Sequence, residues 1–211
     1  LLIDTSWDSN GPMNAPAEYV TGLCEEVQRR GGLIISDEVQ SGYCRYGESW
    51  WGCQNFNFEP DILTCGKPMG GGHPLALTAT RRDIAEAYSK KFSYFNTFGG
   101  NPVSTAVGKA VIEVIDQEKL LDNSRSTGTY MKNALHGLAG KHDLIGDIQG
   151  SGLFWGLDMV SNRETREPLS PDEMRQLGSL IVDEGVITGI SGRYSQVLKL
   201  RPPLPIQPYQ V

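Results

Sequence analysis

Two side chains of opposite charge, Asp37 and Lys67, each follow a short apolar run of the sequence. Asp37 comes directly after Leu33–Ser36, and Lys67 comes after Pro60–Cys65 and one glycine. A lysine placed among glycine and proline after a buried strand can be held partly desolvated. Desolvation lowers the pKa of an amine and frees the neutral form for Schiff-base chemistry. We therefore expect a carboxylate and an amine to converge on one ligand.

Each of these features alone has an ordinary structural explanation. An acidic pair such as Asp37-Glu38 is typical of turns and helix caps, and a single lysine is typical of the surface. The glycines Gly70–Gly72 are typical of a flexible turn. Their joint placement favours function, because ligands of open parallel sheets bind beyond the carboxyl ends of the strands.

The elements that must position these residues alternate between helix and strand. Apolar spacing predicts a helix from Pro16 to Arg30, which Gly31-Gly32 ends. Continuous apolar runs at Leu33–Ser36 and Pro60–Cys65 are typical of strands buried in a parallel sheet. Three further elements are expected: a strand at Leu75–Thr80, a helix at Asp83–Lys91, and a helix capped by Asn101-Pro102 with an apolar stripe from Val103 to Ile115.

The pattern changes beyond about Asp122, where we expect a second, α+β domain. Its predicted elements are a helix, β structure at 145–160, a polar loop at 161–171, a helix near 172–185 and a terminal strand at 196–200. The chain is thus predicted to be α/β with two domains, 1–120 and 121–211. It begins within the strand-like run Leu1–Asp4, so we expect an internal piece of a longer chain.

Composition excludes several classes of function. The formal net charge of -6 and pI near 5.1 disfavour nucleic-acid binding. No apolar run reaches the roughly 20 residues of a membrane span, and the N-terminus lacks a signal-peptide pattern. Four cysteines without a CxxC pair and three histidines disfavour a metal site and indicate reduced thiols. We therefore expect a cytoplasmic protein that acts on small molecules.

Three stretches of the sequence carry a resemblance to a known family. The run Leu33–Gly47, followed by Pro60–Lys67, resembles the signature of class-III pyridoxal-phosphate-dependent aminotransferases with its spacing intact. Asn96–Pro102 is similar to a second motif of that family. The segments Gly66–Pro74 and Leu144–Ile148 resemble in particular the branch with alanine-glyoxylate aminotransferase 2 and the ethanolamine-phosphate phospho-lyases.

The resemblance implies a fold-type-I transferase dependent on pyridoxal 5'-phosphate (PLP). Residues 1–120 would form the second half of its PLP-binding large domain, with a mainly parallel sheet. Residues 121–211 would form an incomplete C-terminal small domain. The functional unit would be a homodimer with shared active sites.

The resemblance also implies a role for each motif residue. Asp37 would pair with the protonated pyridine nitrogen of PLP, Val39 would pack on the ring, and Gln40 would hydrogen-bond near the phenolic oxygen. Lys67 would hold PLP as a Schiff base and then move a proton between substrate and cofactor carbons. Thr97 would donate to the cofactor phosphate of the neighbouring subunit.

The sequence departs from the family pattern at two places. Asp4 stands where many members have glutamate, and the following residues contain no second glutamate, which puts a glutamate-switch mechanism in question. Lys199 stands where arginine often grips a substrate carboxylate. Arg201 is then the substrate-binding candidate, because a guanidinium matches a carboxylate or phosphate bidentately. The alternative is a strand-edge charge that faces solvent.

Three functions stay open at this point. The first is transfer of an amino group from an amine or amino acid to a keto acid. The second is elimination of phosphate from a phosphorylated amine, because both reactions share the early chemistry at Lys67. The third is a truncated or non-catalytic relative, because the segment that would bring the glycine-serine phosphate cup is not present.

Overall fold

The chain divides into two compact units in a computed structural model that describes all residues 1–211. Unit 1 comprises Leu1–Thr5, Ala15–Tyr43 and Ser49–Lys119. Unit 2 comprises Ser6–Asn14, Cys44–Glu48 and Leu120–Val211. The main break therefore falls after Lys119, and two short segments from the N-terminal half belong to unit 2.

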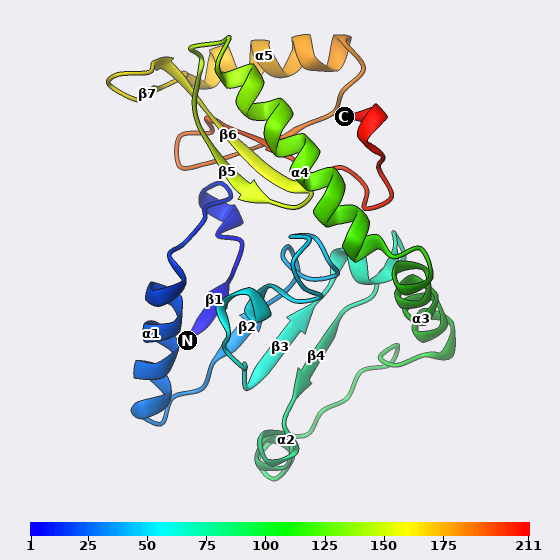
Figure 1. The fold of residues 1–211 in the computed structure, drawn as a ribbon. Helices are drawn as coiled ribbons and strands as arrows, with labels where there is room; N and C mark the ends of the chain where they lie inside the picture. Colours follow the sequence, from blue (N-terminus) through cyan, green and yellow to red (C-terminus); the bar gives the residue numbers. More distant parts are fainter. The chain divides into compact units, whose positions relative to one another are not determined.

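Unit 1 is built on a four-stranded sheet with the order β1-β2-β3-β4 (Figure 1). The strands are β1 (Leu2–Asp4), β2 (Ile35–Asp37), β3 (Ile62–Cys65) and β4 (Leu77–Thr80). β1, β2 and β3 are parallel, whereas β4 is antiparallel to β3. β4 returns directly after a loop, and only an antiparallel neighbour can follow without a long crossover. The predicted mainly parallel sheet is confirmed.

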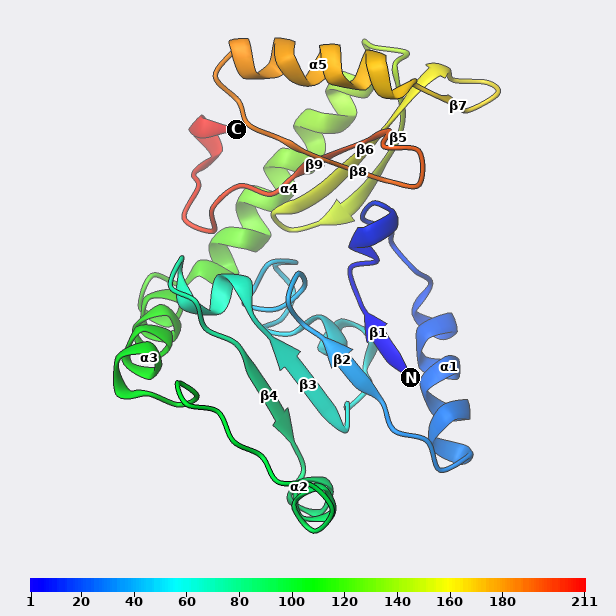
Figure 2. The same ribbon diagram turned by 180° about the vertical axis from the view of Figure 1, so that it is seen from behind.

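Three helices belong to unit 1: α1 (Ala17–Arg29), α2 (Arg82–Ser89) and α3 (Pro102–Gln117). α1 runs alongside β1 in both views (Figures 1 and 2). It ends before Gly31, which takes the left-handed φ of 74° that favours glycine. The predicted cap of α3 is confirmed, because Asn101 Oδ1 accepts a hydrogen bond of 2.9 Å from Ser104 N.

Two elements of unit 1 are present as expected but differ in detail from the sequence pattern. The apolar stripe of α3 is largely exposed, with Val103 68% and Val114 44% exposed, and of the stripe only Ile115 is buried. The turn Lys67–Gly70 covers only part of that face, where a Cβ atom at Gly71 would lie 3.1 Å from Val111 Cγ2. The strand predicted at Leu33–Ser36 starts at Ile35, because Ile34 N donates to the Asp61 side chain and Leu33 is 43% exposed.

Unit 2 contains an antiparallel sheet with the order β5-β6-β9-β8, and a short β7 pairs with β6. Its strands are β5 (Ile145–Ser151), β6 (Phe154–Asn162), β7 (Glu167–Pro168), β8 (Gly189–Ser191) and β9 (Val197–Leu200). The predicted β structure at 145–160 and the terminal strand are confirmed. The sequence did not predict β7 and β8, which have only two and three residues and no alternating pattern.

Helices α4 (Leu120–Ala139) and α5 (Pro171–Asp183) pack on this sheet (Figure 2). The core joins Met131 of α4, Met174 of α5 and Trp155 of β6. α4 approaches the β5-β6 turn very closely, since a Cβ atom at Gly128 would lie 2.4 Å from the Gly152 carbonyl oxygen. None of the helices combines the length and apolar character needed to cross a bilayer.

Candidate active site

The carboxyl ends of the three parallel strands of unit 1 bring polar residues into register. Asp4 of β1 pairs in register with Asp37 of β2, and Asp37 pairs with Thr64 of β3. Lys67 follows three residues after Thr64. The structure therefore places Asp4, Asp37 and the segment that leads to Lys67 at the carboxyl ends of the strands. Ligands of parallel sheets bind at these ends.

The turn after β2 fixes the orientation of Asp37. Its partly buried carboxylate accepts a hydrogen bond of 3.0 Å from Val39 N through Oδ1. Val39 lies against the chain that precedes Lys67, because a Cβ atom at Gly66 would be 3.7 Å from Val39 Cγ2. Gln40 is partly buried in the same turn. The segments of Asp37, Val39 and Lys67 are thus brought together.

Lys67 opens a short 3-10 turn, Lys67–Gly70, with a left-handed backbone φ of 39°. A non-glycine residue in this region costs about 1 to 3 kcal/mol, and such strain clusters at functional sites. The expected partial desolvation was wrong for this chain, because Lys67 is exposed.

Hydrogen bonds connect the loop after Lys67 with the loop that carries Thr97. His73 Nε2 lies 2.7 Å from Ser104 Oγ, and Asn101 Nδ2 donates to the same hydroxyl at 2.9 Å. The Asn101 amide also donates to the Phe98 carbonyl oxygen at 2.8 Å. Thr97 itself lies on an exposed bend, so the structure does not bring it onto Asp37.

Sequence reasoning gave no role to Glu38, which is fully buried beside Asp37. Its Oε1 accepts from Ser36 Oγ and Cys53 N, both at 2.9 Å. Its Oε2 accepts from Ser41 Oγ at 2.7 Å and from Gly52 N at 2.6 Å. The serines that flank Glu38 are the local signal that could have indicated a buried carboxylate with hydroxyl donors.

Unit 2 holds a second charged pair, between Lys199 of β9 and Asp8. Lys199 Nζ lies 3.0 and 3.2 Å from the two Asp8 oxygens, and both side chains are largely buried, 15% and 10% exposed. The Asp8 carboxylate therefore neutralises the charge of Lys199 within the chain. The resemblance to the family gave Asp8 no role. Arg201 is exposed and lines a mainly apolar groove of about 520 Å³.

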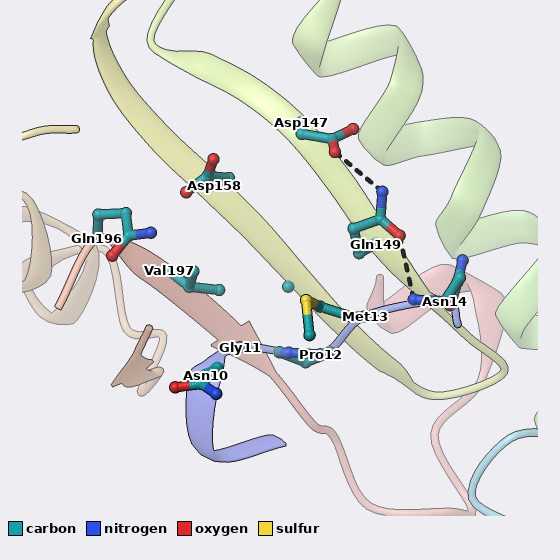
Figure 3. A pocket seen from close by; sticks show the side chains of 11 residues that line it. Asn10, Gly11, Pro12, Met13, Asn14, Asp147, Gln149, Asp158, Gln196 and Val197 are labelled. Carbon is teal, nitrogen blue, oxygen red and sulfur yellow. Dashed lines mark hydrogen bonds between the residues drawn. The ribbon is translucent and has the colours of Figure 1, made fainter. Parts of the chain in front are cut away.

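A polar pocket of about 370 Å³ also lies within unit 2 (Figure 3). Asn14 N donates to Gln149 Oε1 at 3.2 Å, and Gln149 Nε2 donates to Asp147 Oδ2 at 2.9 Å. Asp158 contributes a second carboxylate. No basic residue and none of the site residues predicted from the sequence lines this pocket.

The side chains of Asp37, Lys67 and Val39 in unit 1 fit the chemical groups of PLP. A carboxylate held by a backbone N–H suits a cationic ring nitrogen, an accessible amine suits a Schiff base, and Val39 offers an apolar surface to a ring. The structure contains no group of three or more histidine, cysteine, aspartate or glutamate side chains that could hold a metal ion.

Comparison with known proteins finds a matching family and similar relatives over almost the whole chain. The family described as aminotransferase class-III matches residues 2–211. The chain is 42% identical over 196 residues to the ethanolamine-phosphate phospho-lyase homolog 1 of Caenorhabditis elegans, covering 92% of this chain and 42% of the relative. It is 41% identical over 186 residues to the mitochondrial alanine-glyoxylate aminotransferase 2 homolog 2 of Arabidopsis thaliana, covering 88% and 38%.

A solved structure agrees in fold over almost the whole chain. It is a phospholyase from Arthrobacter in complex with phosphoethanolamine, with a TM-score of 0.91 and 39% identity, covering 96% of this chain and 48% of the other. The chain thus spans less than half the length of these relatives.

Proposed function

Because the chain belongs to the class-III aminotransferase family, we propose that it carries the Schiff-base lysine of a PLP-dependent aminotransferase. The reaction is transfer of an amino group from an amine or amino acid to a keto acid. Unit 1 contributes the second half of the PLP-binding large domain, and unit 2 contributes part of the C-terminal small domain, with the boundary near residue 120.

The observation that carries this proposal is the placement of Asp37 and Lys67 at the carboxyl ends of neighbouring parallel strands, with Val39 against Gly66. When bound, PLP supplies an electron sink for the substrate carbanion. The bond from Val39 N fixes the Asp37 carboxylate, which would hold the proton on the ring nitrogen of the bound cofactor. Lys67 would supply the amine that holds PLP and would then move a proton as general base and acid.

The test is absorbance of the full-length protein that contains this chain. We expect a yellow chromophore with PLP that borohydride bleaches, and we expect Lys67→Ala to abolish it. Lys90→Ala is the matched control, since Lys90 is also exposed in unit 1 and should leave the colour unchanged. A colourless wild-type protein after PLP addition would contradict the proposal and favour a non-catalytic relative.

A homodimer with shared active sites is part of the proposal. Tyr94, Phe95 and Phe98, which flank Thr97, are 74%, 86% and 80% exposed, an apolar surface that suits a subunit interface. We propose that Thr97 donates to the phosphate in the partner's site, and that Gln40 binds near the phenolic oxygen of the cofactor.

Subunit complementation tests this arrangement. Lys67→Ala and Thr97→Ala dimers are each expected to be impaired, whereas mixed dimers regain one intact site and therefore activity. Mixing without any recovery, in a protein that exchanges subunits, would contradict shared sites.

A cytoplasmic location stays a prediction, which cell fractionation tests.

The second candidate is a phospho-lyase, favoured by the similarity to the two phospho-lyases described above. In this reading Arg201 binds the substrate phosphate, whereas in the aminotransferase it binds a substrate carboxylate. Incubation with alanine and a keto acid, against incubation with phosphoethanolamine, separates the two. New amino acid identifies transfer, and released inorganic phosphate identifies elimination.

A further inference from the structure

Glu38 is a buried carboxylate whose two oxygens accept hydrogen bonds from uncharged groups. Ser36, Ser41 and the backbone N–H groups of Gly52 and Cys53 supply two donors to each oxygen. Glu38 forms no ion pair in the structure. Two of the donors are backbone N–H groups that cannot act as acceptors, so this arrangement suits the charged carboxylate.

The titratable groups around Glu38 do not neutralise this charge. Burial, and to a smaller extent the charge of Glu38, raises the pKa of the Cys53 and Cys65 thiols to about 12. Both thiols therefore stay protonated at neutral pH. The other charged groups at this end of the sheet are the carboxylates of Asp37 and Asp4 and the exposed amine of Lys67, which the proposed function assigns to the cofactor. The Glu38 carboxylate is therefore a second negative charge next to Asp37 in the chain, held by uncharged donors.

The same residue fixes the turn that carries the proposed cofactor ligands. Glu38 N donates to the Thr64 carbonyl oxygen at 2.8 Å, and its carbonyl accepts from Gly42 N at 3.0 Å. Together with the four bonds of its side chain, these contacts leave the peptide between Asp37 and Val39 little freedom. The Asp37 carboxylate can then keep its bond to Val39 N.

We propose that Glu38 is a positioning residue of the cofactor site: it holds the Asp37–Val39 turn and adds a second buried negative charge that favours the cationic form of bound PLP. The inference rests on the proposed function, because it assumes that PLP binds at Asp37 and Lys67. Glu38 acts through Asp37 and through its field, without touching the cofactor.

The test is the pH midpoint at which the PLP–Lys67 Schiff base of the full-length holoenzyme loses its proton, read from visible absorbance. Glu38→Gln keeps the size of the side chain and removes the charge. We expect the midpoint to fall by roughly one pH unit, the size expected for one charge nearby in a partly buried site. Glu38→Asp keeps the charge and should restore most of the midpoint.

Asp61→Asn is the matched control. Asp61 is also a buried carboxylate of unit 1, 7% exposed, and accepts from Ile34 N at 2.7 Å. It precedes β3 at the opposite end of that strand from Lys67. Asp61→Asn should lower the melting temperature without moving the midpoint. If Glu38→Gln likewise leaves the midpoint unchanged, Glu38 is only structural and the inference is overturned.

Ser41→Ala decides the question if Glu38→Gln does not fold. The variant keeps the buried charge and removes one donor that partly neutralises it. We expect the midpoint to rise, opposite in sign to the effect of removing the charge. An unchanged or lower midpoint would overturn the inference. A wild-type protein without the chromophore would instead refute the proposed function itself, which is a different result.

Discussion

At the scale of residues, a local motif shows which side chains follow the same strand end, but not the distant partners that they contact in the fold. The strand ends and glycines around Asp37 and Lys67 are visible in the sequence because they follow directly from local pattern. The ion pair of Lys199 with Asp8 joins residues 191 positions apart, and no pattern in the sequence links them. The four donors of Glu38 include two backbone groups of a distant turn, which a sequence does not display.

The Asp8–Lys199 pair predicts a non-additive effect on stability. Asp8→Asn or Lys199→Met alone leaves one largely buried charge without its partner, so each should lower the free energy of unfolding by roughly 2 to 4 kcal/mol. The double variant should recover much of this loss, which urea unfolding of all four proteins measures. Additive losses would show that the two charges do not stabilise each other.

At the scale of elements, caps and breakers were the most reliable signals. Asn101-Pro102 begins α3 and Gly31 ends α1 as predicted, because both act through the local backbone. Burial was less predictable, since an apolar stripe indicates which face could be covered and not what covers it. The exposed stripe of α3 and the two-residue β7 are the clearest examples.

Two glycines of α4 predict opposite effects of the same substitution. Gly128→Ala should destabilise unit 2 by about 2 kcal/mol or more, because the new Cβ atom would lie 2.4 Å from the Gly152 carbonyl oxygen. Gly137 has no atom within 4 Å of a Cβ position, so Gly137→Ala should stabilise by about 0.5 to 1 kcal/mol through helix propensity. Thermal unfolding of both variants checks this, and equal effects would contradict it.

At the scale of the whole molecule, the sequence predicts a break near residue 120 but not the composition of the two units. The segments 6–14 and 44–48 belong to unit 2 although unit 1 surrounds them in sequence. They are short loops without a periodic pattern, so only the tertiary structure assigns them. All four cysteines are buried in the structure, which local sequence likewise does not reveal.

These buried thiols predict loss of stability at alkaline pH. Burial is the first cause that raises the pKa of Cys44, Cys53 and Cys65 from 9.0 to about 12. Because the folded value is the higher one, the contribution to stability is complete below pH 9 and is lost as pH rises towards 12. Each thiol should lower the free energy of unfolding by up to about 1.4 kcal/mol per pH unit.

Urea unfolding at pH 8, 9 and 10 measures this loss. Cys53→Ala is the matched variant, since it removes one titrating thiol and should make the decline shallower. A stability that stays constant between pH 9 and pH 10 would contradict the prediction.

The left-handed backbone at Lys67 implies a conflict between the residue type that the fold favours and the one that the proposed reaction requires. Glycine takes a φ of 39° at little cost, whereas lysine does not. A sequence optimised only for folding would therefore place glycine at position 67 and lose the amine. The proposed Schiff-base lysine is retained at the expense of local stability, and random screens for thermostability should tend to select against it.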